Sequence, residues 1–268
     1  LVFIYIFLYE KYRRRFLLLW ALAWLSHVLR NGVILVNVLH GPLHSLHLVE
    51  QLLVVATGTL LLWGSLEYCN RRPGRVLPLL AGLAALWCPI STALSIPPPW
   101  FYIPTYFYFA LSQMVNGGVL LHRPPARSLG RRVAGWALIL WGVHHLDYPF
   151  LRQVVPFAPW GFLLGGSLAL LAAVSIILAY LEEMQGRLAR SERLFRALFN
   201  SHQASFFLLD AASGDIMDAN EGAAAFTGYS QAALRTMNVC DITTLSPQAH
   251  AALRQQAAAG EVQRYTTC

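Results

Sequence analysis

Long runs of apolar residues fill the first 181 positions of the chain, and short polar joints separate them. A helix needs about 20 apolar residues to cross a bilayer, so we predict about seven membrane segments. They cover residues 1–9, 16–37, 46–67, 76–96, 100–121, 133–151 and 160–181. Proline and glycine occur at the joints, where helices commonly end. The pattern therefore predicts a mainly α-helical fold with a transmembrane bundle over residues 1–181.

The helical pattern continues past the last of these segments. Apolar side chains, with one serine among them, recur at alternating spacings of three and four, the heptad pattern of a coiled coil. These positions are Val174, Ile177, Leu181, Met184, Leu188, Ser191, Phe195 and Leu198. We predict a linker helix over residues 182–200 and a homodimer that pairs through residues 174–198. The alternative is an amphipathic helix that packs on its own domain.

From residue 201 the pattern becomes that of a soluble α+β domain. Two short strands are predicted at Ser205–Asp210 and Asp215–Asn220. The tight turn between them contains Gly214, which suits a position with positive φ. Two short helices follow, broken at Gly228, and Ser230 is the expected cap of the second helix.

Composition supports a membrane protein. Hydrophobic residues make up 56% of the chain and charged residues only 12%, whereas soluble domains are about 25% charged. The four cysteines are scattered without paired spacing, so neither a disulfide framework nor a zinc site is expected.

The net charge of +7 comes from basic clusters between the apolar segments. Residues 10–15, 71–75 and 123–132 together hold eleven lysines and arginines, and the opposite joints hold only Arg152. Cytoplasmic loops carry the excess of Lys and Arg. We therefore expect a bacterial inner membrane protein with its N-terminus outside and its soluble part in the cytoplasm. The lipid bilayer explains the basic clusters, and no nucleic acid partner is predicted.

The stretches RLFRALFNSHQASFFLLD, GDIMDAN and AAAFTGYSQAAL resemble the front of a PAS domain. The resemblance implies an antiparallel sheet with flanking helices, of which residues 201–268 hold the first part and Thr266–Cys268 begins a further strand. It also implies a relaying or dimerising module. No cofactor is predicted, because Cys240 lacks the sequence context of flavin-binding members. Haem-type members need a histidine on a central helix, and none lies between His202 and His250.

The order of membrane bundle, linker helix and PAS segment resembles the input half of bacterial membrane sensors. The stretches LLLWALAWLSHVLR and LWGVHHLDYPFLR share a looser likeness with such sensors. The resemblance implies an output domain, either the histidine kinase of a two-component system or a GGDEF diguanylate cyclase. We expect this enzyme beyond Cys268, because both ends of the sequence read as cut. We predict no catalytic residue within residues 1–268.

Several ionisable and polar residues lie inside the predicted membrane segments. Such residues usually face the interior of a bundle and find partners there. Helical spacing places His27 with Arg30 on one face and His144 with Asp147 on another, at similar depth at ~1.5 Å per residue. The predicted ligand-binding or ion-pair cluster consists of His27, Arg30, Glu50, Tyr102, Tyr106, Gln113, His144 and Asp147.

Four interpretations of these residues remain open. The first is a structural ion-pair lock from Arg30 to Asp147 or Glu50, and the second is a pocket for an unknown signal. The third is a haem held by His27 and His144. The fourth is a metal site, for which the weak candidates are His40, His44 and His47. A transporter is disfavoured, because the sequence has no internal repeat.

Overall fold

The computed structural model describes residues 1–40, 44–97, 99–122, 128–151, 154, 156–201 and 204–258. The chain divides into two compact units, Leu1–Met184 and Gln185–Cys268.

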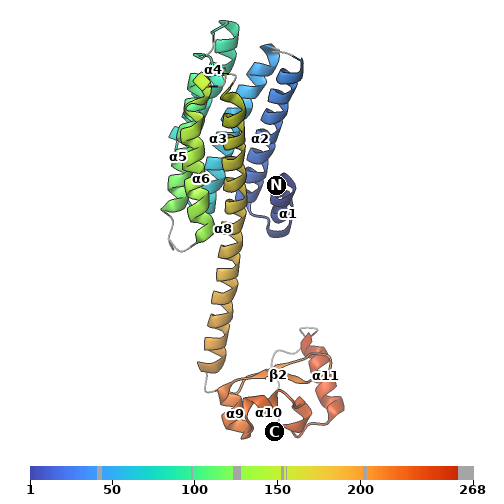
Figure 1. Cartoon of the computed structure of the whole chain (residues 1–268). Helices are drawn as coiled ribbons and strands as arrows, with labels where there is room; N and C mark the ends of the chain where they lie inside the picture. The colour runs from blue at the N-terminus through green and yellow to red at the C-terminus, as the bar shows by residue number, and fades with distance from the viewer. Residues whose placement is uncertain are drawn as a thin grey trace. The chain divides into compact units, whose positions relative to one another are not determined.

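The first unit is a helical bundle (Figure 1). Its helices are α1 (Val2–Tyr12), α2 (Arg15–His40), α3 (His44–Tyr68), α4 (Val76–Ala93), α5 (Ile103–Leu121), α6 (Leu129–His145), α7 (Tyr148–Leu151) and α8 (Ala158–Ser201), the last of which extends into the second unit. Helix α3 packs between α2 and α5, and α6 packs on α5. Each apolar segment predicted from the sequence contains a helix.

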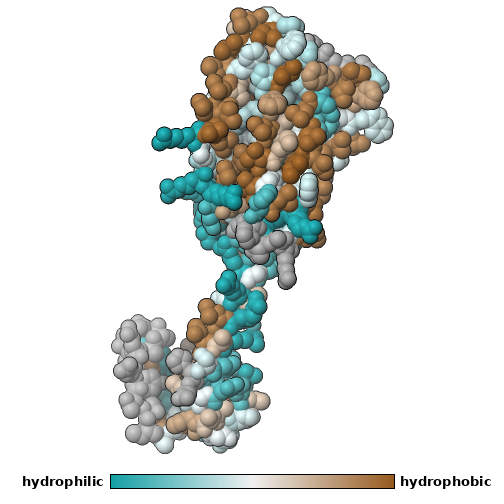
Figure 2. Space-filling view, turned by 90° about the vertical axis from the view of Figure 1, so that its left-hand side faces the viewer, coloured by the Kyte–Doolittle hydropathy of each residue, from teal (hydrophilic) through white to brown (hydrophobic). Residues whose placement is uncertain are grey.

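Four of the described helices are long and apolar enough to cross a membrane. They are α2, the part of α3 from Leu46 to Tyr68, α4 and α8. Hydrophobic side chains cover much of the surface of this unit, as Figure 2 shows. A membrane-associated bundle is therefore plausible on physical grounds, since so much exposed apolar surface is unfavourable in water.

The predicted number of seven spans is not supported. Helix α1 has only 11 residues and α6 has 17, which correspond to about 16 and 25 Å. Helix α5 has 19 residues but buries the polar side chains of Thr105, Ser112, Gln113 and Asn116. We overestimated the hydrophobicity of this segment, because the aromatic residues around these polar positions made it look uniformly apolar.

The sixth predicted segment, residues 133–151, is not one helix. Helix α6 ends at His145, and the separate short helix α7 begins at Tyr148. Pro149 lies in the first turn of α7, where proline fits best because the first amides of a helix need no partner within it. The break places Tyr148 at the start of a new helix.

Glycines allow two pairs of helices to approach closely. A β-carbon at Gly130 of α6 would clash with the backbone of Ala179 in α8, and one at Gly117 of α5 would clash with the carbonyl of Gly135 in α6. Small residues at such contacts let membrane helices pack backbone to backbone. Glu182 of α8 also accepts hydrogen bonds from the Ser128 hydroxyl and the Gly130 amide, at the N-terminus of α6. One end of α6 is thereby fastened to α8.

The second unit holds a small antiparallel sheet of β1 (Phe207–Leu209) and β2 (Ile216–Ala219), paired with Phe207 opposite Ala219. It is followed by α9 (Glu221–Thr227), α10 (Gln231–Leu234), the 3-10 helix η1 (Val239–Asp241) and α11 (Pro247–Ala258). The two predicted strands are confirmed, although both are shorter than expected. The strand predicted at Thr266–Cys268 lies outside the described residues.

The turns of this unit also agree with the sequence. Gly214 and Gly228 have φ of 82° and 76°, and the Ser230 side chain accepts from the Ala233 amide to cap α10. Asp210 stabilises the turn between the strands. Hydrogen bonds from the backbone amides of Ser213 and Ala212 hold the pKa of the Asp210 carboxyl below its usual value.

The buried side chain of Asn220 joins the parts of this unit. Its oxygen accepts from the amides of Phe206 and Ala223, each at 2.8 Å, so it caps α9 and holds the start of β1. Its nitrogen donates to the carbonyls of Phe199 and Ala204, each at 2.9 Å. One side chain thus ties the end of α8 to the sheet and to α9.

The substitution Asn220→Ala is expected to destabilise this unit by about 1–3 kcal/mol, because it leaves several buried backbone groups unpaired. Hydrogen exchange of the full chain should show faster exchange at the Phe206 and Ala223 amides. Asn200→Ala is the matched control, because Asn200 is exposed. Equal exchange in the two variants would contradict the role of Asn220.

Candidate functional site

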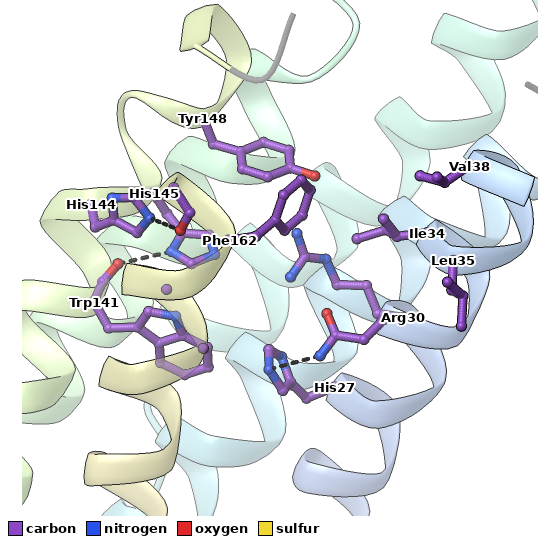
Figure 3. A pocket seen from close by; sticks show the side chains of 14 residues that line it. His27, Arg30, Ile34, Leu35, Val38, Trp141, His144, His145, Tyr148 and Phe162 are labelled. Carbon is purple, nitrogen blue, oxygen red and sulfur yellow. Dashed lines mark hydrogen bonds between the residues drawn. The ribbon is translucent and has the colours of Figure 1, made fainter. Parts of the chain in front are cut away.

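The candidate site is a cavity of about 360 Å³ in the first unit, between α2, α6, α7 and the start of α8 (Figure 3). Its lining is His27, Arg30, Asn31, Ile34, Leu35, Val38, Trp141, His144, His145, Tyr148, Gly161, Phe162, Gly165 and Gly166. Three of the residues predicted from the sequence, His27, Arg30 and His144, line it.

Arg30 is the buried cation of this site, with a relative exposure of 5%. Its Nη2 donates to the Tyr106 hydroxyl at 3.0 Å, and that hydroxyl donates to Glu50 Oε1 at 3.2 Å. The Tyr148 hydroxyl donates to the same oxygen at 3.3 Å. A chain of hydrogen bonds therefore connects the Arg30 guanidinium to the fully buried Glu50 carboxylate.

Aromatic rings hold the guanidinium from one side. The rings of Tyr106 and Tyr148 stack with centroids 4.2 Å apart. The Arg30 guanidinium carbon lies 5.6 and 5.4 Å from the two centroids, within the range of a cation–π attraction. Figure 3 shows the side chain of Arg30 reaching from α2 toward Tyr148 and Phe162.

His145 extends the aromatic stack, and the sequence did not identify it as a site residue. Its ring is nearly parallel to the rings of Tyr106 and Tyr148, and its Nδ1 donates to the Trp141 carbonyl at 2.9 Å. Helical spacing correctly placed His145 about 100° from His144, but this direction points to α5. Trp141, His145 and Tyr148 are spaced by four and three residues. This spacing was the sequence feature that could have identified His145 as a site residue.

His144 connects α6 to the start of α8. Its Nε2 donates to the Gly161 carbonyl at 3.0 Å, and its ring lies against the position where Gly165 has no side chain. Its Nδ1 lies 3.4 Å from Asp147 Oδ2. Asp147 thus shares a face with His144, as predicted, and its side chain is 45% exposed.

His27 lies on the other side of the cavity. Its Nε2 is 3.3 Å from the Asn31 amide nitrogen, and its ring packs edge-on against Trp24 and Trp141. Among the hydrogen bonds of the described residues, the partner of Arg30 is Tyr106 rather than Asp147. The predicted contact between the His27–Arg30 face and α6 is therefore made through aromatic rings.

The other predicted residues lie behind or apart from the cavity. The Tyr102 hydroxyl is 3.3 Å from His47 Nδ1, and the Tyr102 ring packs edge-on against Tyr106. Gln113 is fully buried further along α5, where its amide nitrogen lies 3.5 Å from the Ser112 hydroxyl. Gln113 does not share in the contacts of Arg30.

The haem and metal hypotheses find little support in the side chains. Both ring nitrogens of His144 face partners, and His27 Nε2 faces Asn31, so these residues do not fit a pair of axial ligands as they stand. Over the described part of the chain, no group of three or more metal-ligating side chains occurs. The side chain of His44 lies outside the described residues, so the candidate set of His40, His44 and His47 stays a prediction.

Comparison with known proteins identifies one part of the chain. Residues 193–262 match the family model described as PAS domain. No curated protein and no solved structure matches the chain. The chain therefore has a PAS domain at residues 193–262 and a set of apolar helices before it.

The substitution Tyr106→Phe is expected to lower the free energy of unfolding by about 1–3 kcal/mol, because it removes the hydroxyl that bridges two buried charges. Thermal unfolding in detergent measures this change. Tyr108→Phe is the matched control, since it removes a hydroxyl paired with the neutral Thr59 and should cost about 0.5–1.5 kcal/mol. A smaller loss for Tyr106→Phe than for the control would contradict the charge bridge.

Proposed function

We propose that this chain is the sensory input region of a bacterial membrane receptor. The observation that carries this proposal is helix α8, which runs unbroken over 44 residues from Ala158 to Ser201. It contains a candidate membrane span and overlaps the start of the PAS domain at residue 193. A change in the packing of α8 in the bundle can thus reach the PAS domain along one continuous helix.

The receptor is proposed to lie in the inner membrane with its PAS domain in the cytoplasm. The support is the sequence alone, because the basic joints alternate with joints almost free of Lys and Arg. The output enzyme is proposed to lie C-terminal to Cys268, as a histidine kinase or a diguanylate cyclase. The order of apolar bundle, linker helix and PAS domain supports this assignment by resemblance.

A homodimer is proposed to form through residues 174–198 of α8. Leu188, Phe195 and Leu198 of the heptad are 72%, 53% and 56% exposed in the single chain. Glu192 and Arg196 form an ion pair beside the heptad positions. Large apolar side chains on one helical stripe with charges beside it are typical of a coiled coil.

The relay through α8 can be tested at His144, whose hydrogen bond to the Gly161 carbonyl joins α6 to α8. His144→Phe should remove this bond and change amide exchange in residues 185–201 and in β1 and β2. Hydrogen exchange of the full chain in nanodiscs measures the effect. His122→Phe is the matched control, because His122 is exposed and, among the described residues, its hydrogen bond is to the Gly118 carbonyl of its own helix. A change confined to residues before Met184 would contradict the relay.

The dimer can be tested by cysteine cross-linking in a chain whose four native cysteines are changed to serine. Ser191→Cys lies on the proposed seam, and Ala189→Cys lies beside it, and both positions are exposed. Mild oxidation should convert the Ser191→Cys chain to a covalent dimer at least several times faster than the Ala189→Cys chain. Equal rates would exclude pairing through this seam.

A further inference from the structure

The polar side of the cavity offers hydrogen-bond donors and one permanent cation. Arg30 supplies these donors, because the His144 and His145 N–H groups already donate to the Gly161 and Trp141 carbonyls, and the Tyr148 hydroxyl donates to Glu50. The described lining contains no carboxylate. Glu50 lies behind the Tyr106 and Tyr148 hydroxyls rather than in the lining. The cavity therefore favours a ligand whose polar end accepts hydrogen bonds and carries negative charge.

Arg30 has hydrogen-bond donors left for such a ligand. A guanidinium has five N–H donors, and the hydrogen bond to Tyr106 uses one on Nη2. Its Nε has no partner among the described residues. The rings of Tyr106 and Tyr148 hold the group in place, and a fixed guanidinium suits a planar carboxylate because two parallel hydrogen bonds can form.

Apart from His27 and Asn31, which pair with each other, the remaining lining is apolar and leads to the outer surface of α2. Ile34, Leu35 and Val38 form one wall, and Figure 3 shows them across the cavity from His144 and His145. Leu35 and Val38 are 57% and 74% exposed, so this wall faces the lipid of any membrane that α2 crosses. Gly165 and Gly166 of α8 leave room where side chains would otherwise project.

We propose that the cavity binds a single-chain amphiphile with an anionic head, such as a long-chain carboxylate. The head pairs with Arg30 near His144 and Tyr148, and the chain lies along Ile34, Leu35 and Val38 toward the lipid. A volume of about 360 Å³ is within the range of small-molecule sites, about 300–1,000 Å³. The inference rests on the proposed function in that the cavity is taken as the input site of the receptor.

The test is photolabelling of the full chain in nanodiscs of uncharged lipid. The probe is hexadecanoic acid with a diazirine on its chain, and mass spectrometry locates the label. Unlabelled hexadecanoic acid should compete at least tenfold better than hexadecanol. Competition by hexadecyl phosphate would support the shared anionic chemistry and identify phosphate as an accepted head. Equal competition by hexadecanol or decylubiquinone, or labelling that does not saturate, would overturn the proposal.

Three variants make the test specific to this cavity. Gly166→Leu should abolish saturable labelling by filling the cavity, and it should fold, because a β-carbon there meets no atom within 4 Å. Gly82→Leu is the matched control at an exposed position of α4, with equal space, and should keep labelling. Arg30→Gln should weaken competition by hexadecanoic acid about ten- to a hundredfold, as expected for a lost hydrogen bond to a charged group.

These experiments test the proposed ligand binding and the proposed signalling role independently. Photolabelling does not depend on the PAS domain, and the exchange experiment at His144 does not depend on a ligand. Labelling at Ile34, Leu35 or Val38 without a relay through α8 would contradict the proposed receptor function but support the proposed ligand class. A relay without saturable labelling would contradict the proposed ligand class but support the proposed receptor function. Labelling unchanged by Gly166→Leu would place the amphiphile outside this cavity and overturn the proposal.

Discussion

A buried arginine in an apolar bundle constrains the rest of this structure. A buried charge without partners is costly among apolar side chains, so Arg30 must find partners within the protein. It finds them on three other helices, through Tyr106 of α5, Glu50 of α3 and Tyr148 of α7. The need to satisfy one cation thereby fixes how α2, α3, α5 and α7 meet.

Helix α8 is held to the bundle in a different way. Its contacts at the two ends of α6 are hydrogen bonds, from His144 to the Gly161 carbonyl and from Ser128 and Gly130 to Glu182. At the Gly130 end, the missing side chain also allows close packing against Ala179. The Tyr5 and Tyr68 hydroxyls also donate to the carbonyls of Ala173 and Ala179, and Ala172 and Ile176 of α8 lie in the buried core. Apolar packing and bonds to its backbone thus hold α8, rather than the buried charge network of Arg30.

The sequence predicted which segments are helical and named three residues that line the cavity, His27, Arg30 and His144, but it did not predict how the site residues pair. Periodicity and depth brought out Arg30, Glu50 and Tyr106, because buried polar groups in apolar helices are few. Depth along a helix says nothing about rotation between helices, so Arg30 was matched to Asp147 as readily as to Glu50. Tyr148 and His145 were not included in the predicted cluster, because the end of α6 at His145 could not be read from an apolar run. The two strands and the caps at Gly228 and Ser230 depend on local geometry and were predicted directly.

The unbroken course of α8 from Ala158 to Ser201 also limits how this protein can evolve or be recombined. Each residue added to or removed from a continuous helix rotates everything after it by about 100° and shifts it by about 1.5 Å. Changes of seven residues nearly restore the original direction. Natural or engineered chimeras that join this bundle to another cytoplasmic module should therefore preserve the helical phase at the junction, so that length variation in this linker is confined to steps of whole heptads.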